Sequence, residues 1–182
     1  GQGAVSGNIS MRGFNAEGTI NAVKLLIDGI PSNTSSGQIR YMELASQLDI
    51  DRMEVVKGTN DPRYGLHNTA GNADIITKIG GNYKKARVTA GSFNTANVHA
   101  AMGSESGNLS QNYAVSYKTT DGYREHADSE DYNLSGKWFL SSDDGKGRVG
   151  FIARHYNVNA EEPGYLTQAE VNADPTQSPV HN

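Results

Sequence analysis

The 182-residue chain contains no cysteine, no long apolar run and no excess of basic residues. The absence of cysteine excludes disulfides, thiolate zinc sites and cysteine nucleophiles. No uninterrupted apolar run is longer than three residues. A membrane-spanning helix needs about 20 mostly apolar residues, so the sequence predicts no such helix. With 16 basic and 20 acidic residues and a formal net charge of -4, the composition indicates no nucleic-acid partner, because such proteins carry a basic face.

The sequence changes character near residue 80. Before it, short apolar segments are separated by isolated turn signals. Residues 24–28 are typical of a strand, Asp28-Gly29 is a strong hairpin signal, and Pro31 ends the ladder because proline has no N–H to donate. Farther along, we expect a helical turn at residues 49–51 and a strand at residues 53–56.

After residue 80, five segments alternate between apolar and polar residues. They span residues 84–90, 95–103, 109–118, 132–141 and 148–158. A period of two predicts strands with one apolar and one polar face. The apolar face could pack in the core of a soluble β-sandwich or contact lipid on a membrane barrel. Alternation alone favours the soluble arrangement.

The connections between these segments favour the membrane arrangement. Short turns are expected at residues 104–108 and 142–147, whereas residues 119–131 form a long connection and another long polar stretch follows the fifth segment. Bacterial barrels have short periplasmic turns and long extracellular loops. Aromatic residues within the segments or near their ends are suggestive of interfacial girdles: Tyr113, Tyr117, Tyr132, Trp138 and Tyr156.

Five short motifs occur in a fixed order within residues 9–79. They are MRGF (11–14), LIDGIP (26–31), DIDRMEVVKG (49–58), RYG (63–65) and AGNADIITK (70–78). In this order and spacing they resemble the plug domain of TonB-dependent outer-membrane receptors of the siderophore or iron-complex type. Two positions depart from the family pattern: Lys57 stands where the family usually has Arg, and Asp74 stands where Asn is usual.

The resemblance implies a fold in two parts. Residues 1–79 would be the C-terminal part of an α+β plug, a small mixed sheet with short helices. Residues 80–182 would be about the first five strands of an antiparallel transmembrane β-barrel, with their extracellular loops. The family's barrel has 22 strands, and five cannot close. We therefore expect a longer protein, with a signal peptide and a TonB box upstream and further strands downstream.

The same resemblance implies a function. It predicts a receptor in the outer membrane of a Gram-negative bacterium that binds and imports a ferric siderophore or similar iron chelate. Its partners would be the chelate, outer-membrane lipid and the TonB complex, which acts through the N-terminal box. Iron would arrive within the chelate, so we expect no resident cofactor and no enzyme activity. Alternatives are a receptor for heme, cobalamin or an oligosaccharide, a signalling receptor with an added periplasmic domain, or a soluble β-rich binding module.

Candidate ligand contacts follow from the family, in which apical plug loops and extracellular loops meet the cargo. The side chains best suited to an oxygen-rich chelate are Arg12, Gln38, Arg40, Tyr41, Tyr123, Arg124 and His126. Guanidinium suits carboxylate or catecholate charge, whereas phenol and amide suit neutral hydroxamates. Arg12 could instead pair with the barrel, and the loop residues could simply be solvated. We expect Asp28 to be a turn residue, and we expect no metal ligand and no catalytic residue.

Overall fold

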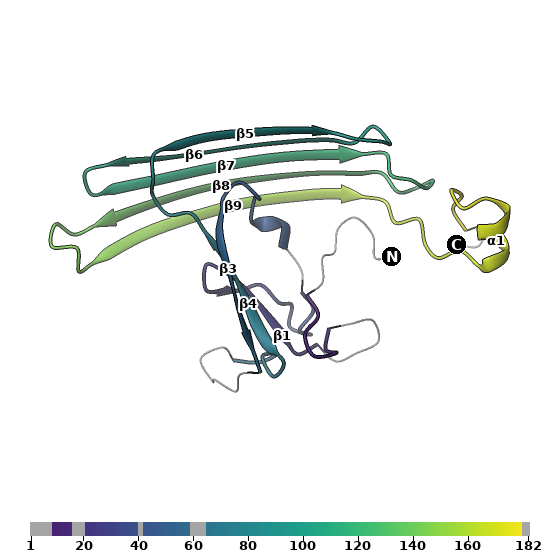
Figure 1. Ribbon diagram of the computed structural model, residues 1–182, viewed down its shortest axis with the longest axis horizontal. Helices are drawn as coiled ribbons and strands as arrows, with labels where there is room; N and C mark the ends of the chain where they lie inside the picture. The colour runs from purple at the N-terminus through teal and green to yellow at the C-terminus, as the bar shows by residue number, and fades with distance from the viewer. Residues whose placement is uncertain (1–8, 16–20, 40–41, 59–64, 180–182) are drawn as a thin grey trace.

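The structure is a computed structural model that describes residues 9–15, 21–39, 42–58 and 65–179. These residues form two sheets, one with the strand order β2-β1-β4-β3 and one with the order β5-β6-β7-β8-β9. Figure 1 shows the long strands of the second sheet lying side by side above the smaller first sheet, whose strands run across them at a steep angle.

The first sheet is mixed. β1 (Val23–Ile27) pairs antiparallel with the short β2 (Ile30–Pro31) and parallel with β4 (Gly71–Thr77), while β3 (Ile50–Lys57) pairs antiparallel with β4. Asp28 and Gly29, at the β1–β2 turn, both have positive φ, 52° and 77°, as the tightest hairpin turns require. The predicted hairpin is therefore confirmed.

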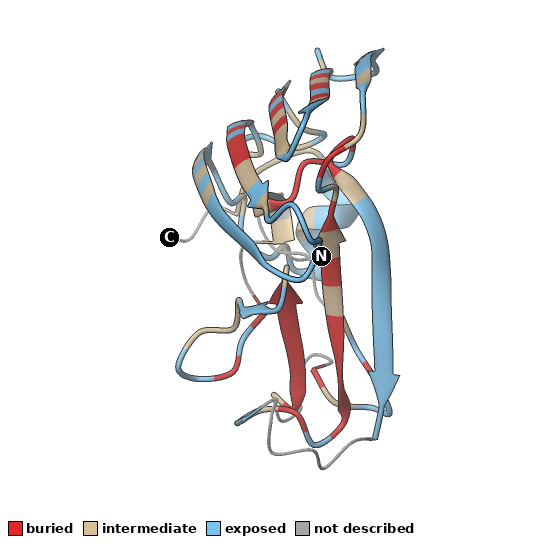
Figure 2. Cartoon of the chain, turned by 90° about the vertical axis from the view of Figure 1, so that its left-hand side faces the viewer, coloured by how far each residue is buried: buried red, intermediate tan, exposed pale blue. Residues whose placement is uncertain are grey.

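β1 is the centre of the apolar core of this sheet. All five of its residues are buried, and Val23, Leu25 and Ile27 pack in one cluster with Ala73 and Ile75 of β4. Figure 2 shows these two strands as the most buried part of the first sheet, with β3 exposed at its edge. β1 lies between two strands and is apolar except for Lys24, whose buried ammonium donates to the Leu66 carbonyl at 3.0 Å.

The helical turn predicted at residues 49–51 is wrong. The turn lies earlier, where the Asp49 N–H donates to the Ser46 carbonyl at 2.9 Å, and Ile50 and Asp51 already belong to β3. Ile50 pairs with Thr77 of β4, and an irregularity in the register follows before Arg52. Pairing with β4 therefore overrides the local turn signal of the two aspartates. A short 3-10 helix, η1 (Met42–Leu44), lies just upstream.

The second sheet is antiparallel throughout, and each strand pairs with the next in sequence. Its strands include all or nearly all of each predicted segment and extend beyond most of them: β5 (Tyr83–Ala90), β6 (Ala96–Ser106), β7 (Leu109–Thr120), β8 (Ser129–Ser141) and β9 (Arg148–Ala160). The turns at one end comprise residues 107–108 and 142–147. The opposite end carries residues 91–95, residues 121–128 and the segment after β9, and we call it the long-loop end.

The segment after β9 contains one short helix, α1 (Gln168–Ala173). Thr167 caps it, because the Thr167 hydroxyl accepts from the Glu170 N–H while the Glu170 carboxylate accepts from the Thr167 N–H. This reciprocal arrangement is a capping box. In the part of the chain that the structure describes, no helix has both the length and the apolar character needed to cross a membrane.

The two faces of the second sheet differ as the alternation predicts. On β7, Asn112, Ala114 and Ser116 are buried toward the first sheet, and we call this side the inner face. Val115 and Tyr117 lie on the opposite, outer face and are 46% and 40% exposed. Outer-face residues from Leu109 to Tyr117 cover the about nine to eleven residues that a tilted strand needs to span a bilayer.

Three aromatic side chains cluster on the outer face near the short-turn end. The Trp138 indole N–H donates to the Tyr113 hydroxyl at 2.9 Å, and the two rings meet edge to face at 5.7 Å. Phe151 stacks on the other side of Trp138, with ring centroids 5.9 Å apart. Aromatic rings on the outer face near one end of the strands are typical of the aromatic girdle of outer-membrane barrels.

Candidate functional site

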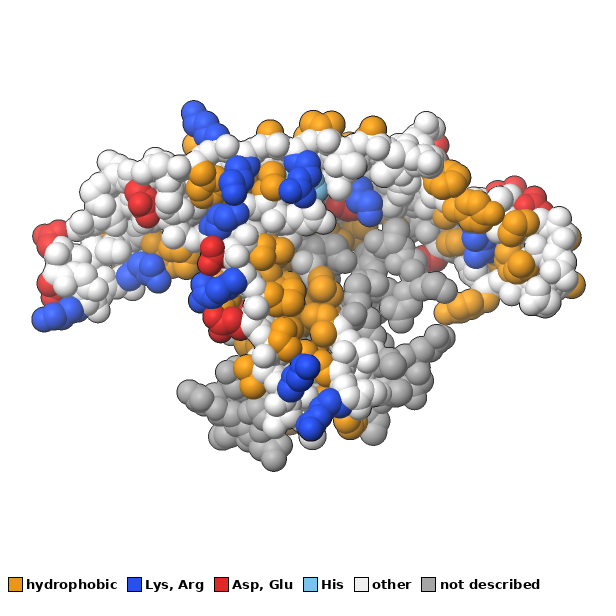
Figure 3. Space-filling model, viewed as in Figure 1, with side chains coloured by type: hydrophobic (Ala, Val, Ile, Leu, Met, Phe, Trp, Pro, Cys, Tyr) orange, Lys and Arg blue, Asp and Glu red, His pale blue; other side chains and the backbone are white. Residues whose placement is uncertain are grey.

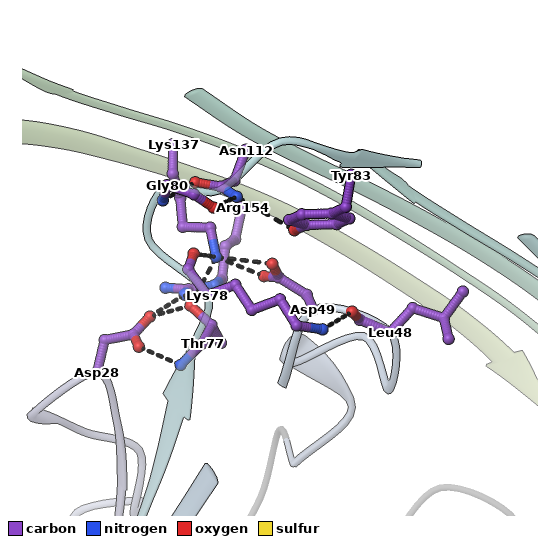
Figure 4. Close-up of polar contacts among 10 residues, drawn as sticks. All are labelled: Asp28, Leu48, Asp49, Thr77, Lys78, Gly80, Tyr83, Asn112, Lys137 and Arg154. Atoms are coloured by element: carbon purple, nitrogen blue, oxygen red, sulfur yellow. Dashed lines mark hydrogen bonds and ion pairs between the residues drawn. The ribbon is translucent and has the colours of Figure 1, made fainter. Parts of the chain in front are cut away.

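The most buried charged residue lies between the two sheets. Lys137 of β8 points from the inner face, and its side chain is completely inaccessible to solvent, as is nearly all of Asp49. The Lys137 ammonium donates to both Asp49 carboxylate oxygens at 2.7 and 2.8 Å. It also donates to the Thr77 hydroxyl at 2.8 Å and the Lys78 carbonyl at 2.6 Å. Figure 4 shows these groups converging on one nitrogen atom.

A second ion pair lies beside the first. Asp28, in the β1–β2 turn, pairs with the Arg154 guanidinium of β9 and accepts from the Thr77 N–H at 2.7 Å and the Thr77 hydroxyl at 2.8 Å. Burial raises the pKa of Asp28, but these hydrogen bonds and the charge of Arg154 outweigh it and leave the pKa below its ordinary value. Asp28 therefore remains ionised at neutral pH.

The segment between β4 and β5 is held by an amide. The Asn112 side chain of β7 accepts from the Gly80 N–H at 2.6 Å and donates to the Gly80 carbonyl at 2.9 Å. The same Asn112 amide donates to the Tyr83 hydroxyl at 3.1 Å. Lys78 anchors the other side of this segment by donating to the Leu48 carbonyl at 2.5 Å.

Together these contacts form what we call the polar lock: Asp28, Asp49, Thr77, Gly80, Asn112, Lys137 and Arg154 (Figure 4). Its two carboxylates belong to the first sheet and its turns, while its two cations belong to the inner face of the second sheet. Apolar contact at this junction is small, since its buried cluster consists of Leu48, Ala101 and Ala114. A junction made of directional polar bonds resists sliding while intact and can be rehydrated when pulled apart.

The charged groups of the lock are engaged with one another. Among the described residues, no three His, Cys, Asp or Glu side chains gather where they could hold a metal ion. The two carboxylates are each taken up by a cation, so neither is positioned as a general base. What the arrangement can do is hold one element against another.

Three of the expected ligand contacts lie together at the long-loop end. The Arg124 guanidinium donates to the carbonyls of Pro163, Gly164 and Gln177 at 2.8 to 3.3 Å. Tyr123 packs edge to face on Phe93 at 5.6 Å. The His126 imidazole lies 2.9 Å from a Glu161 carboxylate oxygen. These side chains therefore join the loops to one another in this structure, and their contact with cargo stays a prediction.

The remaining expected contacts are not brought to that cluster by any bond described in the structure. Arg12 has positive φ (55°) between the bridged residues Met11 and Phe14, and its guanidinium packs on Gly58. Gln38 closes a small turn in which its N–H donates to the Thr34 hydroxyl at 3.1 Å. Arg40 and Tyr41 lie outside the described residues.

Lys137 and Arg154 lie in two of the segments expected to alternate, but the sequence assigned them no function. Asp28 is the turn residue that was expected and also accepts the Arg154 ion pair. The available signal was a lysine and an arginine at inward positions of two neighbouring strands. Their partners lie 88 and 126 positions away in the sequence, so the pattern alone could not pair them.

Residues 1–72 match the TonB-dependent receptor plug domain family. The chain carries the plug domain of a TonB-dependent receptor, followed by strands of its barrel. Over 72 residues it is 35% identical to the vitamin B12 transporter BtuB of Vibrio vulnificus. This match covers 40% of this chain and 11% of that protein. Receptors of this family reside in the Gram-negative outer membrane and are not enzymes.

Solved receptors share the fold of both sheets. The unliganded ferric citrate transporter FecA superposes with a TM-score of 0.70 and 21% identity over 87% of this chain and 26% of that one. The ferric yersiniabactin uptake receptor FyuA from Yersinia pestis gives 0.66 and 19%, covering 83% and 25%. The pyoverdine receptor FpvA from Pseudomonas aeruginosa PAO1 gives 0.62 and 22%, covering 82% and 22%. The chain thus spans about a quarter of the length of these receptors.

Proposed function

We propose that the complete receptor containing this chain imports a ferric siderophore or similar iron chelate, with residues 1–79 in its plug and residues 80–182 in its first barrel strands. The observation that supports this most is the polar lock, in which Lys137 holds Asp49 and Arg154 holds Asp28. A plug that only sealed the barrel could be packed by apolar contact. A junction of buried ion pairs suits a plug that must stay closed and yet be displaced.

In this proposal the cargo binds above the plug and the TonB complex supplies force from the periplasm. Bacterial barrels expose their longer loops to the outside, so the end carrying Tyr123, Arg124 and His126 faces the medium. These three, with Arg12, Gln38, Arg40 and Tyr41, are the proposed contacts. The hydrogen bonds of Arg124 to the described carbonyls use four of the five N–H groups of its guanidinium, so one N–H can be donated to cargo without releasing a carbonyl.

Uptake by intact cells tests the proposal. The full receptor is expressed in a Gram-negative strain that lacks its own receptors, and radioactive iron is supplied as ferric citrate, a ferric tris(catecholate) or a ferric tris(hydroxamate). We expect at least one chelate to enter in a TonB-dependent manner. Iron uptake that is the same with and without the receptor would contradict the proposal.

Cobalamin is the second candidate, because the 35% identity over the plug is to a vitamin B12 transporter. The same cells, supplied with labelled vitamin B12, distinguish the two cargos. Uptake of vitamin B12 with no uptake of any iron chelate would favour cobalamin.

A further inference from the structure

A row of basic side chains lies on the inner face of the second sheet, beyond the polar lock. Lys85 and Arg87 of β5 share the inner face with Tyr83, which contacts Asn112. Arg87 pairs in register with His99 of β6, and Lys118 of β7 lies one inward position farther along. Figure 3 shows Lys and Arg side chains gathered over the strands of this sheet. We call Lys85, Arg87, His99 and Lys118 the basic strip.

The register places the strip between the lock and the loops. His99 pairs with Ser116, which pairs with Asn133, four positions along β8 from Lys137. At about 3.3 Å per residue, this level lies roughly 13 Å from the lock toward the long-loop end. Lys118 pairs with Asp131, six positions along β8 from Lys137. By the same rise it lies about 20 Å from the lock. A cargo that enters past the loops and stops above the plug meets this part of the wall.

The cations of the strip form no ion pairs with described residues of the second sheet. Within the described residues no ion pair involves Lys85, Arg87 or Lys118, and Asp131 is the one acidic residue among their direct register partners. By contrast, the two cations nearer the plug, Lys137 and Arg154, are each paired with a plug carboxylate. Among the described residues, the strip therefore gathers unpaired positive charge beyond the lock. Arg148, on the inner face at the short-turn end, likewise has no ion pair with a described residue and lies over the Phe139 ring at 5.3 Å.

His99 gives an independent reason to regard this level as a binding surface. It is only 6% exposed, and neither of its ring nitrogens has a hydrogen-bond partner among the described residues. Buried polar groups are nearly always hydrogen-bonded in folded proteins. An unpartnered imidazole beside Arg87 is suited to an oxygen-rich ligand that brings its own acceptors.

We propose that the basic strip is part of the cargo site and that it selects an anionic chelate, one whose metal-binding groups are carboxylates or catecholates. This inference rests on the proposed function. Guanidinium and ammonium groups attract oxyanions through charge-assisted hydrogen bonds, and a water-poor lumen strengthens that attraction. A neutral cargo gains little from the same groups and must still displace their water.

Binding to the full receptor in detergent tests the strip, with ferric citrate as the anionic probe and cyanocobalamin and a neutral ferric tris(hydroxamate) as controls. Arg87→Gln and Lys118→Gln each should weaken ferric citrate binding by roughly threefold to tenfold, with a smaller salt dependence, and leave the neutral probes unchanged. Lys84→Gln removes the same charge from the neighbouring, outer-face position of β5 and should have no effect. Asp131→Asn should strengthen ferric citrate binding.

The outcomes separate this inference from the proposed function. If the receptor binds the ferric tris(hydroxamate) but not ferric citrate, iron uptake stands and the anionic selection is overturned. If Arg87→Gln and Lys84→Gln have equal effects, or if Asp131→Asn weakens binding, the strip is not part of the site. If only cyanocobalamin binds, both the inference and the proposed function fail.

Discussion

β1 of the first sheet is buried along its whole length and packs Val23, Leu25 and Ile27 into an apolar core, whereas the five strands of the second sheet bury only alanines and polar side chains on their inner face. The first sheet therefore has a core of its own. The second sheet has none, because its large apolar residues, such as Leu134 and Phe151, point outward and are 54% and 65% exposed. What joins the sheets is polar, so the plug can be separated from the wall without disrupting either sheet.

Breaking the central ion pair should have the largest effect. Lys137→Ala leaves the Asp49 carboxylate buried without its cation, and removing one member of a buried pair costs about 3 to 5 kcal/mol. We expect the plug of the full receptor to become accessible to hydrogen exchange around residues 46–50. Lys84→Ala, an exposed lysine of the outer face, is the matched control and should leave that exchange unchanged.

The double replacement Lys137→Met with Asp49→Leu sharpens this comparison. Since replacing a buried ion pair by apolar residues is often neutral or stabilising, we expect the double variant to restore protection that Lys137→Met alone loses. Protection restored without transport would show that the ion pair is needed for release of the plug. An additive loss in the double variant would show that the two residues do not interact.

Within the first sheet, Leu25→Ala should destabilise the plug by about 2 to 5 kcal/mol, the usual cost of removing a buried leucine side chain. Leu25 is fully inaccessible to solvent. Leu134→Ala, on the outer face of β8, should change plug stability far less. Denaturant-dependent exchange of plug amides measures both, and equal effects would mean that the two sheets share one core.

Removing the hydrogen bonds between Asn112 and Gly80 should have the next largest effect. Asn112→Ala removes both hydrogen bonds to Gly80 and leaves a buried N–H and carbonyl unpaired, at a cost of about 1 to 3 kcal/mol. We expect faster exchange at residues 79–82, while the hairpin of β7 and β8 keeps its protection. An exchange rate at Gly80 equal to that of the unaltered receptor would show that backbone geometry alone holds the segment.

The smallest expected effect is on pH dependence. The pKa of Asp28 in the folded protein lies below its ordinary value. Its ionised form therefore stabilises the folded plug, and this stabilisation is fully present above the unfolded pKa of about 3.9. It is lost as the pH falls through the folded pKa. The protection of plug amides, relative to their intrinsic exchange rate at each pH, should therefore fall below about pH 4. In Asp28→Asn this fall should shrink, while protection at neutral pH decreases. A fall of unchanged size would assign the acid effect to other carboxylates.

The sequence was sufficient for the strands and their faces because a period of two is a local property that survives in any sheet. It also predicted the Asp28-Gly29 turn. It failed at residues 49–51, where pairing of Ile50 with Thr77 decides the conformation. It could not find the lock, because Lys137 and Asp49 are brought together only by the placement of one sheet on the other.

The expected ligand contacts show the same limit. Arg124 was selected for its charge, yet the structure commits its guanidinium to three carbonyls of the segment after β9. Residues chosen by chemistry alone are as suited to fastening loops as to binding cargo. The residues of the basic strip, by contrast, are polar positions in the alternation of β5, β6 and β7. Only the location of the plug indicates how far along the sheet the strip lies from it.

The most direct test uses the natural absence of cysteine, which allows single labels at adjacent positions of β7. A fluorophore at Val115→Cys, on the outer face, should be quenched by a lipid-attached quencher and not by a water-soluble one. A fluorophore at Ala114→Cys, which packs in the junction cluster with Leu48, should resist both until Lys137→Ala opens the junction and admits the water-soluble quencher. Lipid quenching at position 114 and protection at position 115 would contradict the account.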